Sequence, residues 1–178
     1  MNKSISWIFL FCILGLMGCG EPTQEQKIEK LIEKLKVKNP CARRISASEL
    51  GLIGSKDAVP SLIKALQQDQ DPEVRVSAAE ALGNIGSINT KDAISALILA
   101  LQDKVKGVRA SAAKALRNIG IDAKDAVPAL ILALQDKVGD VRGSAAEALG
   151  SIGEGSEDMV PALIQTLKDQ DPWVRGHA

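Results

Sequence analysis

The stretch Asp103–Gln135, DKVKGVRASAAKALRNIGIDAKDAVPALILALQ, is repeated with small changes before and after its own position in the chain. A Val-Arg pair marks each copy, and its arginine stands at positions 75, 109, 142 and 175, in steps of 34, 33 and 33 residues. A degenerate earlier copy has its arginine, Arg43, 32 residues before Arg75. Repeats of this length indicate a solenoid, in which each unit buries its apolar surface against its neighbours.

Each unit is predicted to contain two helices. The first helix of the second unit is predicted over Glu73–Ile85, with Asp71 as its N-cap and Gly86 supplying the left-handed residue at its end. The second helix of the third unit is predicted over Ala126–Gln135. Its N-cap is predicted to be Asp125, and that of the corresponding helix in the first unit to be Asp57, because the proline three residues later is tolerated only in the first helical turn.

The repeated pattern resembles a known family. The string V-R-x-x-A-A-x-A-L-x-x-I-G at Val108–Gly120, followed by D-A-V-P-A-L-I-x-A-L at Asp125–Leu134, resembles the HEAT-like repeats of phycobilisome lyases. The ankyrin and tetratricopeptide signatures are absent from the sequence. We therefore expect an all-α fold: a right-handed α-solenoid of about four two-helix HEAT-like repeats over residues 40–178, with an N-terminal capping helix and a truncated last repeat.

The first residues have the features of a bacterial export signal. Lys3 precedes an apolar run, Trp7–Leu16, that is too short to span a bilayer comfortably. The string Leu16-Met17-Gly18-Cys19 resembles a lipoprotein lipobox, which implies removal of residues 1–18 and acylation of Cys19. The alternative is an ordinary secretory signal with an incidental cysteine. The resemblance implies a lipid-anchored protein of the bacterial cell envelope, and Gly20 after Cys19 favours the outer over the inner membrane.

Between the signal and the repeats, residues 19–26 are expected to form a flexible tether that carries the lipid. Residues 27–39 are predicted to form a capping helix, because Ile28, Leu31, Ile32 and Leu35 have the spacing of one helical stripe. A helix lying on the membrane surface is the alternative. Glutamates mix with lysines on its polar face, so anionic lipid would select that face only weakly.

The recurrent arginines have acidic residues at a fixed spacing. An aspartate stands six residues before each of the last four arginines. Arg–Asp bonds within or between repeats would satisfy both charges and orient the stack. We favour this structural ladder over a row of anion-binding arginines. Its predicted members are Arg75, Arg109 and Arg142 with Asp69, Asp103 and Asp136.

Residues that differ between the units indicate a candidate binding surface. Where the first unit has Lys64, the following units have Leu99, Leu132 and Gln165. Helical geometry places this position away from the apolar stripe, so both leucines are predicted to be exposed on an inner, concave row. With Gln68, these residues form a candidate site for a helical or extended peptide. The alternative is that neighbouring helices cover the leucines. Arg117, which replaces a glycine of other units, is predicted to face solvent on the outer side.

The amino-acid composition argues against several kinds of activity. The 22 basic and 22 acidic residues cancel, and only four aromatic residues occur, so nucleic-acid binding is disfavoured. The single histidine, His177, cannot form a histidine-based relay or metal set. Cys41, the one cysteine outside residues 1–19, is expected to be a small apolar filler. We therefore predict a non-catalytic interaction scaffold without cofactor, metal or small-molecule substrate. The alternative is an enzyme-associated module of the phycobilin lyase type.

Overall fold

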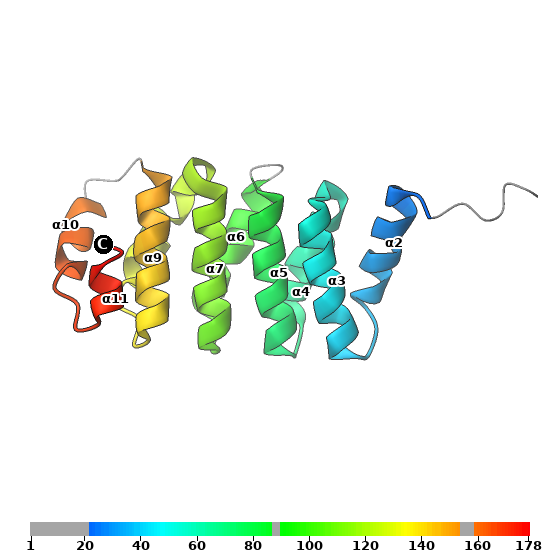
Figure 1. Cartoon of the computed structure of the whole chain (residues 1–178), viewed down its shortest axis with the longest axis horizontal. Coiled ribbons are helices and arrows are strands. Elements are labelled where there is room, and N and C mark those ends of the chain that lie inside the picture. Colours follow the sequence, from blue (N-terminus) through cyan, green and yellow to red (C-terminus); the bar gives the residue numbers. More distant parts are fainter. Residues whose placement is uncertain (1–21, 87–89, 154–158) are drawn as a thin grey trace, which may run out of the picture.

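The computed structural model describes residues 22–86, 90–153 and 159–178, which are helical apart from their connections (Figure 1). The predicted signal peptide and Cys19 lie outside these residues. The helices are α2 (Gln24–Lys34), α3 (Pro40–Ile53), α4 (Val59–Gln68), α5 (Pro72–Ile85), α6 (Thr90–Ala100), α7 (Lys106–Ile119), α8 (Val127–Ala133), α9 (Gly139–Ile152), α10 (Met159–Thr166) and α11 (Pro172–Arg175), with two 3-10 segments, η1 (Lys56–Ala58) and η2 (Gly120–Ala126).

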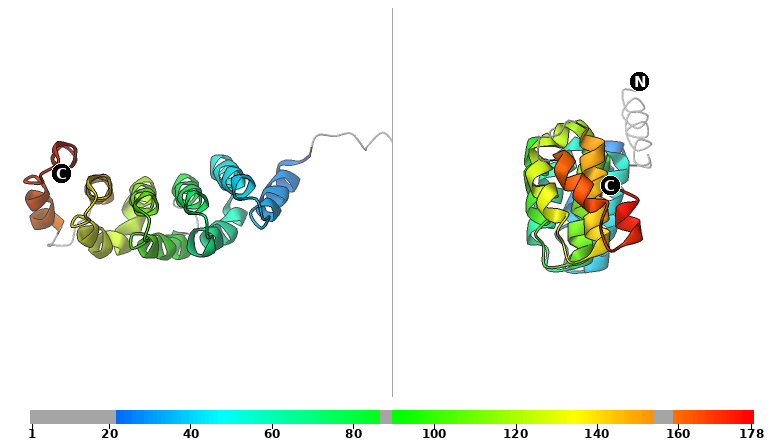
Figure 2. Two further views of the ribbon diagram at one scale, coloured as in Figure 1. Left: turned by 90° about the horizontal axis from the view of Figure 1, so that it is seen from below. Right: turned by 90° about the vertical axis from the view of Figure 1, so that its left-hand side faces the viewer.

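The helices stack in two rows. One row contains α3, α5, α7, α9 and α11, and the other contains α2, α4, α6, α8 and α10. Figure 2 shows that the stack is curved and that the first row lies on the hollow side, so we call it the inner row and the second the outer row. The predicted all-α solenoid is thereby confirmed.

Small residues allow the inner helices to approach one another closely. A Cβ added to Gly51 of α3 would lie 2.6 Å from the Cα of Ala81, and one added to Gly83 of α5 would lie 2.6 Å from the Cα of Ala115. Such distances leave room for a glycine but not for a side chain. The outer helices are instead separated by grooves, such as the one between α6 and α8. The stack therefore curves toward the inner row.

The core between the rows repeats with the units. The inner helices α3, α5, α7 and α9 each bury one leucine completely, and the outer helices α4, α6 and α8 do the same. Burial of a leucine contributes about 1.5–3 kcal/mol, and a single helix pair cannot supply this shelter alone. The fully buried leucines are Leu50, Leu62, Leu82, Leu97, Leu116, Leu130 and Leu149.

The capping helix begins earlier and ends earlier than predicted. α2 starts at Gln24 because Thr23 accepts a hydrogen bond from the backbone N–H of Gln26, whose side chain accepts one from the N–H of Thr23. The predicted tether through residue 26 is therefore too long by at least three residues. The helix ends at Lys34, with Leu35 as its C-cap, rather than continuing to 39, and Asn39 is the N-cap of the next helix.

The helix ends test the predicted caps. Asp71 accepts a hydrogen bond from the N–H of Glu73 and is the N-cap of α5, as predicted. The prediction for Asp125, and the same prediction for Asp57, is wrong: a 3-10 segment precedes α8 and α4, and each aspartate lies within that segment. The left-handed conformation is confirmed for Gly54, with φ 71° and ψ 27°, but Gly86 and Gly120 combine φ 71° with ψ of −150° and −138°, so the prediction for Gly86 holds only for the sign of φ.

Within the described residues, no helix combines the length and the apolar character that crossing a bilayer would require. The longest helices have 14 residues, and each presents a polar face.

Candidate partner-binding surface

The two leucines that the sequence singled out are exposed. Leu99 on α6 is 62% exposed and Leu132 on α8 is 66% exposed, although most leucines of this chain are buried. The neighbouring outer helices do not cover them. The polar members of the predicted surface, Lys64, Gln68 and Gln165, are also exposed. The prediction of exposure is therefore confirmed for all five residues.

The predicted location of this surface is wrong. Leu99 and Leu132 lie on the outer, convex row rather than on a concave one (Figure 2). The curvature follows from the close contacts of Gly51 and Gly83 with the next inner helices. The glycines and alanines of the Val-Arg helices were the signal in the sequence that could have identified the inner row.

Grooves separate the outer helices. The groove between α6 and α8 has a volume of about 270 Å³, and Leu132 forms part of its wall. Lys64 and Gln68 line a groove of about 330 Å³ between α2 and α4, and Gln165 lines one of about 440 Å³ between α8 and α10. Leu99 stands outside these three grooves. The outer face thus alternates ridges with grooves that a partner side chain could enter.

The Arg–Asp ladder exists, and it links consecutive units. Arg75 donates from Nε to Oδ2 of Asp103 at 2.9 Å and from Nη2 to Oδ1 at 3.1 Å. Its Nη1 donates to the backbone carbonyls of Asp69 and Gln70, at 2.9 and 3.3 Å. The arginine therefore pairs with the aspartate of the following unit and contacts only the backbone of the aspartate six residues before it. The same forward pairing joins Arg109 with Asp136 and Arg142 with Asp169.

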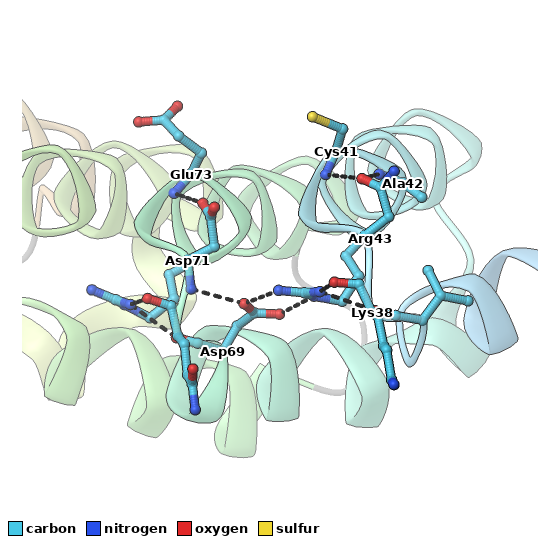
Figure 3. Close-up of polar contacts among 11 residues, drawn as sticks. Lys38, Cys41, Ala42, Arg43, Asp69, Asp71 and Glu73 are labelled. Carbon is cyan, nitrogen blue, oxygen red and sulfur yellow. Dashed lines mark hydrogen bonds and ion pairs between the residues drawn. The ribbon is translucent and has the colours of Figure 1, made fainter.

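Figure 3 shows the first step of this ladder, which joins Arg43 to Asp69. Arg43 is not among the predicted members of the ladder, because the sequence of its unit is degenerate. Asp69 accepts from Nε and Nη2 of Arg43 at 2.6 and 2.7 Å and also from the N–H of Asp71 at 3.0 Å. One carboxylate therefore holds the preceding unit and shapes the start of the next inner helix.

Burial and hydrogen bonds shift the pKa values of the ladder carboxylates. Desolvation by burial raises the pKa of Asp103, but hydrogen bonds from Arg75 and from the N–H of Val105 lower it more, and the net pKa lies below the usual value. Asp69 and Asp136 balance the same influences with the same result. For Asp169, the hydrogen bond from Arg142 is the largest influence and lowers the pKa. The ladder is therefore ionised at neutral pH.

Two other predicted positions differ from expectation. Arg117 does not face solvent on the outer side: it lies on α7 of the inner row and pairs with Glu147 of α9. Glu147 also pairs with Nε2 of His177 at 2.9 Å, while Nδ1 of His177 lies 2.7 Å from the carbonyl of Trp173. Cys41 is exposed rather than a buried filler. Among the described residues, no cluster of histidine, cysteine or acidic residues has the arrangement of a metal site.

Comparisons with known proteins agree with this architecture. A family model described as HEAT repeats matches residues 28–117 and 94–178. A search of curated protein sequences found no match.

Among solved structures, YibA of Escherichia coli is 26% identical, with a TM-score of 0.74 over 87% of this chain and 58% of that chain. The complex of CpcE and CpcF of phycocyanin lyase from Nostoc sp. is 29% identical, with a TM-score of 0.72 over 84% of this chain and 61% of that chain. A designed armadillo repeat protein for modular peptide recognition, 21% identical with a TM-score of 0.63 over 84% of this chain and 78% of that chain, shares the fold. Because the family model covers most of the chain, the chain belongs to the HEAT repeat family.

Proposed function

We propose that the protein is a non-catalytic, lipid-anchored scaffold for protein–protein interaction in the bacterial cell envelope. Membership of the HEAT repeat family supports the interaction role. The observation that carries the proposal is the pair of exposed leucines, Leu99 and Leu132, at the same position of two consecutive outer helices. Each leucine exposes well over half of its surface. The stack does not require an apolar residue at this position, because the first and last units carry Lys64 and Gln165 there.

The proposed partner is a helical or extended peptide that crosses the outer face. An apolar side chain of the partner would pack against Leu132 at the groove between α6 and α8. The polar side chains of Lys64 and Gln165 would limit the apolar contact at its two ends. This arrangement, an apolar centre with a polar rim, is typical of peptide-binding surfaces.

Substitution of the leucines tests this surface. In the variant Leu99→Glu/Leu132→Glu, we expect cross-linking and mass spectrometry to recover the partner at a strongly reduced level, because two charges would be desolvated in the contact. The matched control is Leu52→Glu, since Leu52 is 82% exposed but lies on α3 of the inner row. Equal partner recovery by the double variant and the control would remove the outer leucines as the binding surface.

The lipid anchor rests on the lipobox-like string that ends at Cys19. α2 begins at Gln24, so a chain of five residues, about 18 Å when extended, would join the lipidated cysteine to the repeats. The capping end of the solenoid would then lie next to the membrane, with the outer membrane as the favoured location. Acyl chains contribute about 0.8 kcal/mol per buried CH₂, and more than one chain gives stable anchoring.

Processing of the full chain tests the anchor separately. We expect globomycin to block cleavage before Cys19 and mass spectrometry to find acyl groups on Cys19. Cys19→Ser should release the protein from the membrane fraction without changing its helical content. Unaltered maturation in the presence of globomycin would contradict lipoprotein processing while leaving the scaffold role intact.

A second candidate function is an enzyme-associated module of the phycobilin lyase type. The likeness to the CpcE and CpcF complex, 29% identity with a TM-score of 0.72, is the observation that favours it. Co-purification of a bound chromophore would support this function. We favour the scaffold because residues 1–19 resemble an export signal of the lipoprotein kind.

A further inference from the structure

The polar side of α2 is divided into a basic part and an acidic part. At about 100° per residue, three lysines lie within about 60° of one another, and three glutamates lie about 130° away, on the other side of the apolar stripe. All six side chains are exposed. We call the three lysines, Lys27, Lys30 and Lys34, the lysine flank; the glutamates are Glu25, Glu29 and Glu33. The charges are therefore separated around the helix, unlike the mixed polar face expected from the sequence.

The lysine flank points away from the rest of the stack. Leu31 and Leu35 of the apolar stripe are buried, and α2 packs against α3. Ile32 and Leu35 also line the groove that separates α2 from α4. The lysine flank lies roughly 140° from the mean direction of these two residues, and α2 is the first helix of the described stack (Figure 1). A membrane contact through the apolar stripe is therefore excluded, whereas a contact through the lysine flank is sterically open.

The charges of the lysine flank are not neutralised by the part of the protein that the structure describes. Across residues 22–86, 90–153 and 159–178, none of the three ammonium groups takes part in a salt bridge. By contrast, Lys36 just after the helix pairs with Glu33 at 2.7 Å, and Arg43 of α3 pairs with Asp69. A partner of negative charge could therefore meet all three ammonium groups at once.

The charge of the whole solenoid is distributed unevenly along its length. Residues 22–48, which form α2 and the first part of α3, contain seven basic and three acidic residues. Residues 49–178 contain 14 basic and 18 acidic residues. The solenoid is thus positive at its α2 end and negative over the remaining units. An anionic surface would attract the α2 end and repel the rest, and would orient the molecule.

We infer that the lysine flank docks this end of the solenoid onto an anionic phospholipid bilayer. The inference rests on the proposed lipid anchor, which would hold Gln24 within about 18 Å of Cys19. Lys34 lies about 15 Å farther along the helix, so the tether lets the whole flank reach the lipid headgroups. Anchoring also raises the effective concentration of the flank at the bilayer, where anionic lipid attracts lysine.

Docking through the lysine flank would fix the orientation of the solenoid. The acyl chains alone hold one end of the molecule and leave it free to tumble. With the flank on the headgroups, the negative units extend away from the bilayer, and Leu99 and Leu132 on the middle outer helices remain open to a protein partner. Lipid is favoured over an acidic protein as the occupant, because the anchor places lipid next to the flank.

Lysine footprinting of the mature lipoprotein tests the docking. The protein is reconstituted in vesicles of phosphatidylcholine alone, or of phosphatidylcholine and phosphatidylglycerol in equal parts, and treated with an uncharged acetylating reagent. We expect mass spectrometry to show severalfold slower acetylation of the lysine flank in the anionic vesicles, and high salt should remove the difference by screening the attraction. The internal controls are exposed lysines at matching positions of three units, Lys56, Lys91 and Lys124, which should react equally in both kinds of vesicle.

Charge reversal gives a second measurement. Trp173 of α11 lies at the opposite end of the stack from α2 (Figure 1), so docking keeps it away from the lipid. In anionic vesicles, Lys27→Glu/Lys30→Glu/Lys34→Glu should let the solenoid tumble and should increase energy transfer from Trp173 to a dansyl-labelled lipid. The same reversal at the three control lysines changes the net charge equally and should leave the transfer unchanged.

The outcomes separate the docking from the anchor. An acylated, vesicle-bound protein whose lysine flank reacts equally in both kinds of vesicle would overturn the docking alone, as would equal energy transfer by the two charge-reversal variants. Protection of the flank in neutral and anionic vesicles alike would mean that protein rather than lipid covers it, and would also overturn the docking. A protein without acyl groups that leaves both kinds of vesicle would contradict the anchor and the docking together. If the reversed variant loses its helical circular dichroism, the footprint of the unchanged protein decides.

Discussion

Arg75 and Asp103 join two consecutive repeats through a pair of parallel hydrogen bonds, of 2.9 and 3.1 Å, across 28 residues of sequence. The remaining nitrogen of the same guanidinium group holds the turn before its own helix, through the carbonyl of Asp69. One side chain therefore fixes the shape of its own unit and the position of the next. This dual contact accounts for the recurrence of the Val-Arg pair.

Breaking the ladder should destabilise the protein. We expect Asp103→Asn to lower the free energy of unfolding by about 2–3 kcal/mol, because the buried guanidinium of Arg75 loses its charged acceptor. Urea denaturation followed by circular dichroism measures the loss. The control is Glu33→Gln, which breaks the exposed Lys36–Glu33 pair and should cost less than about 1 kcal/mol. Equal effects of the two substitutions would contradict a structural ladder.

The stability of the ladder should depend on pH in the acid range. The aspartates Asp69, Asp103, Asp136 and Asp169 have folded-state pKa values below the usual one, so their contribution is fully present above about pH 4–5 and declines as the pH falls through the folded-state values. Thermal melts from pH 7 to pH 2 should therefore show the unchanged protein approaching Asp103→Asn in stability. A difference that stays constant over this range would contradict the predicted linkage.

The close approach of the inner helices should make Gly83 intolerant of a side chain. Gly83→Ala places a Cβ 2.6 Å from the Cα of Ala115, so α5 and α7 must separate, at a cost of about 1–3 kcal/mol. Gly150 occupies the same position in α9 and has no atom within 4 Å of an added Cβ. Gly150→Ala should be neutral or stabilise by up to about 1 kcal/mol. Equal destabilisation by both changes, measured by urea denaturation, would rule out helix spacing as the cause.

The last short helix depends on another glycine. Trp173 of α11 lies so close to Gly143 of α9 that an added Cβ would overlap its ring. Gly143→Ala should displace the ring, which is already 41% exposed, toward water and shift its fluorescence emission to longer wavelength. Trp173 is the only tryptophan after the predicted signal peptide, so the mature protein reports this change directly. Gly150→Ala serves as the control and should leave the emission unchanged.

Much of the candidate site could be predicted from the repeated sequence. The exposure of Leu99 and Leu132 follows from helical periodicity, because each position is far from the apolar stripe of its own helix. The existence of Arg–Asp bonds follows from charge and recurrence. The partner of each arginine cannot be predicted in this way, because a bond within one unit and a bond between two units are equally consistent with the constant spacing. The prediction of Asp57 and Asp125 as N-caps is wrong because 3-10 segments occupy the turn before each proline.

The sequence alone determined that this chain is a stack of helix pairs, because the period, the helix ends and the apolar stripe recur together in each unit. Only the tertiary structure decided which row is hollow and which aspartate each arginine binds. These properties depend on distances between helices rather than on the pattern within one helix. Glycine and alanine on the inner row let those helices approach closely, the stack curves toward that row, and Leu99 and Leu132 therefore lie on the convex face.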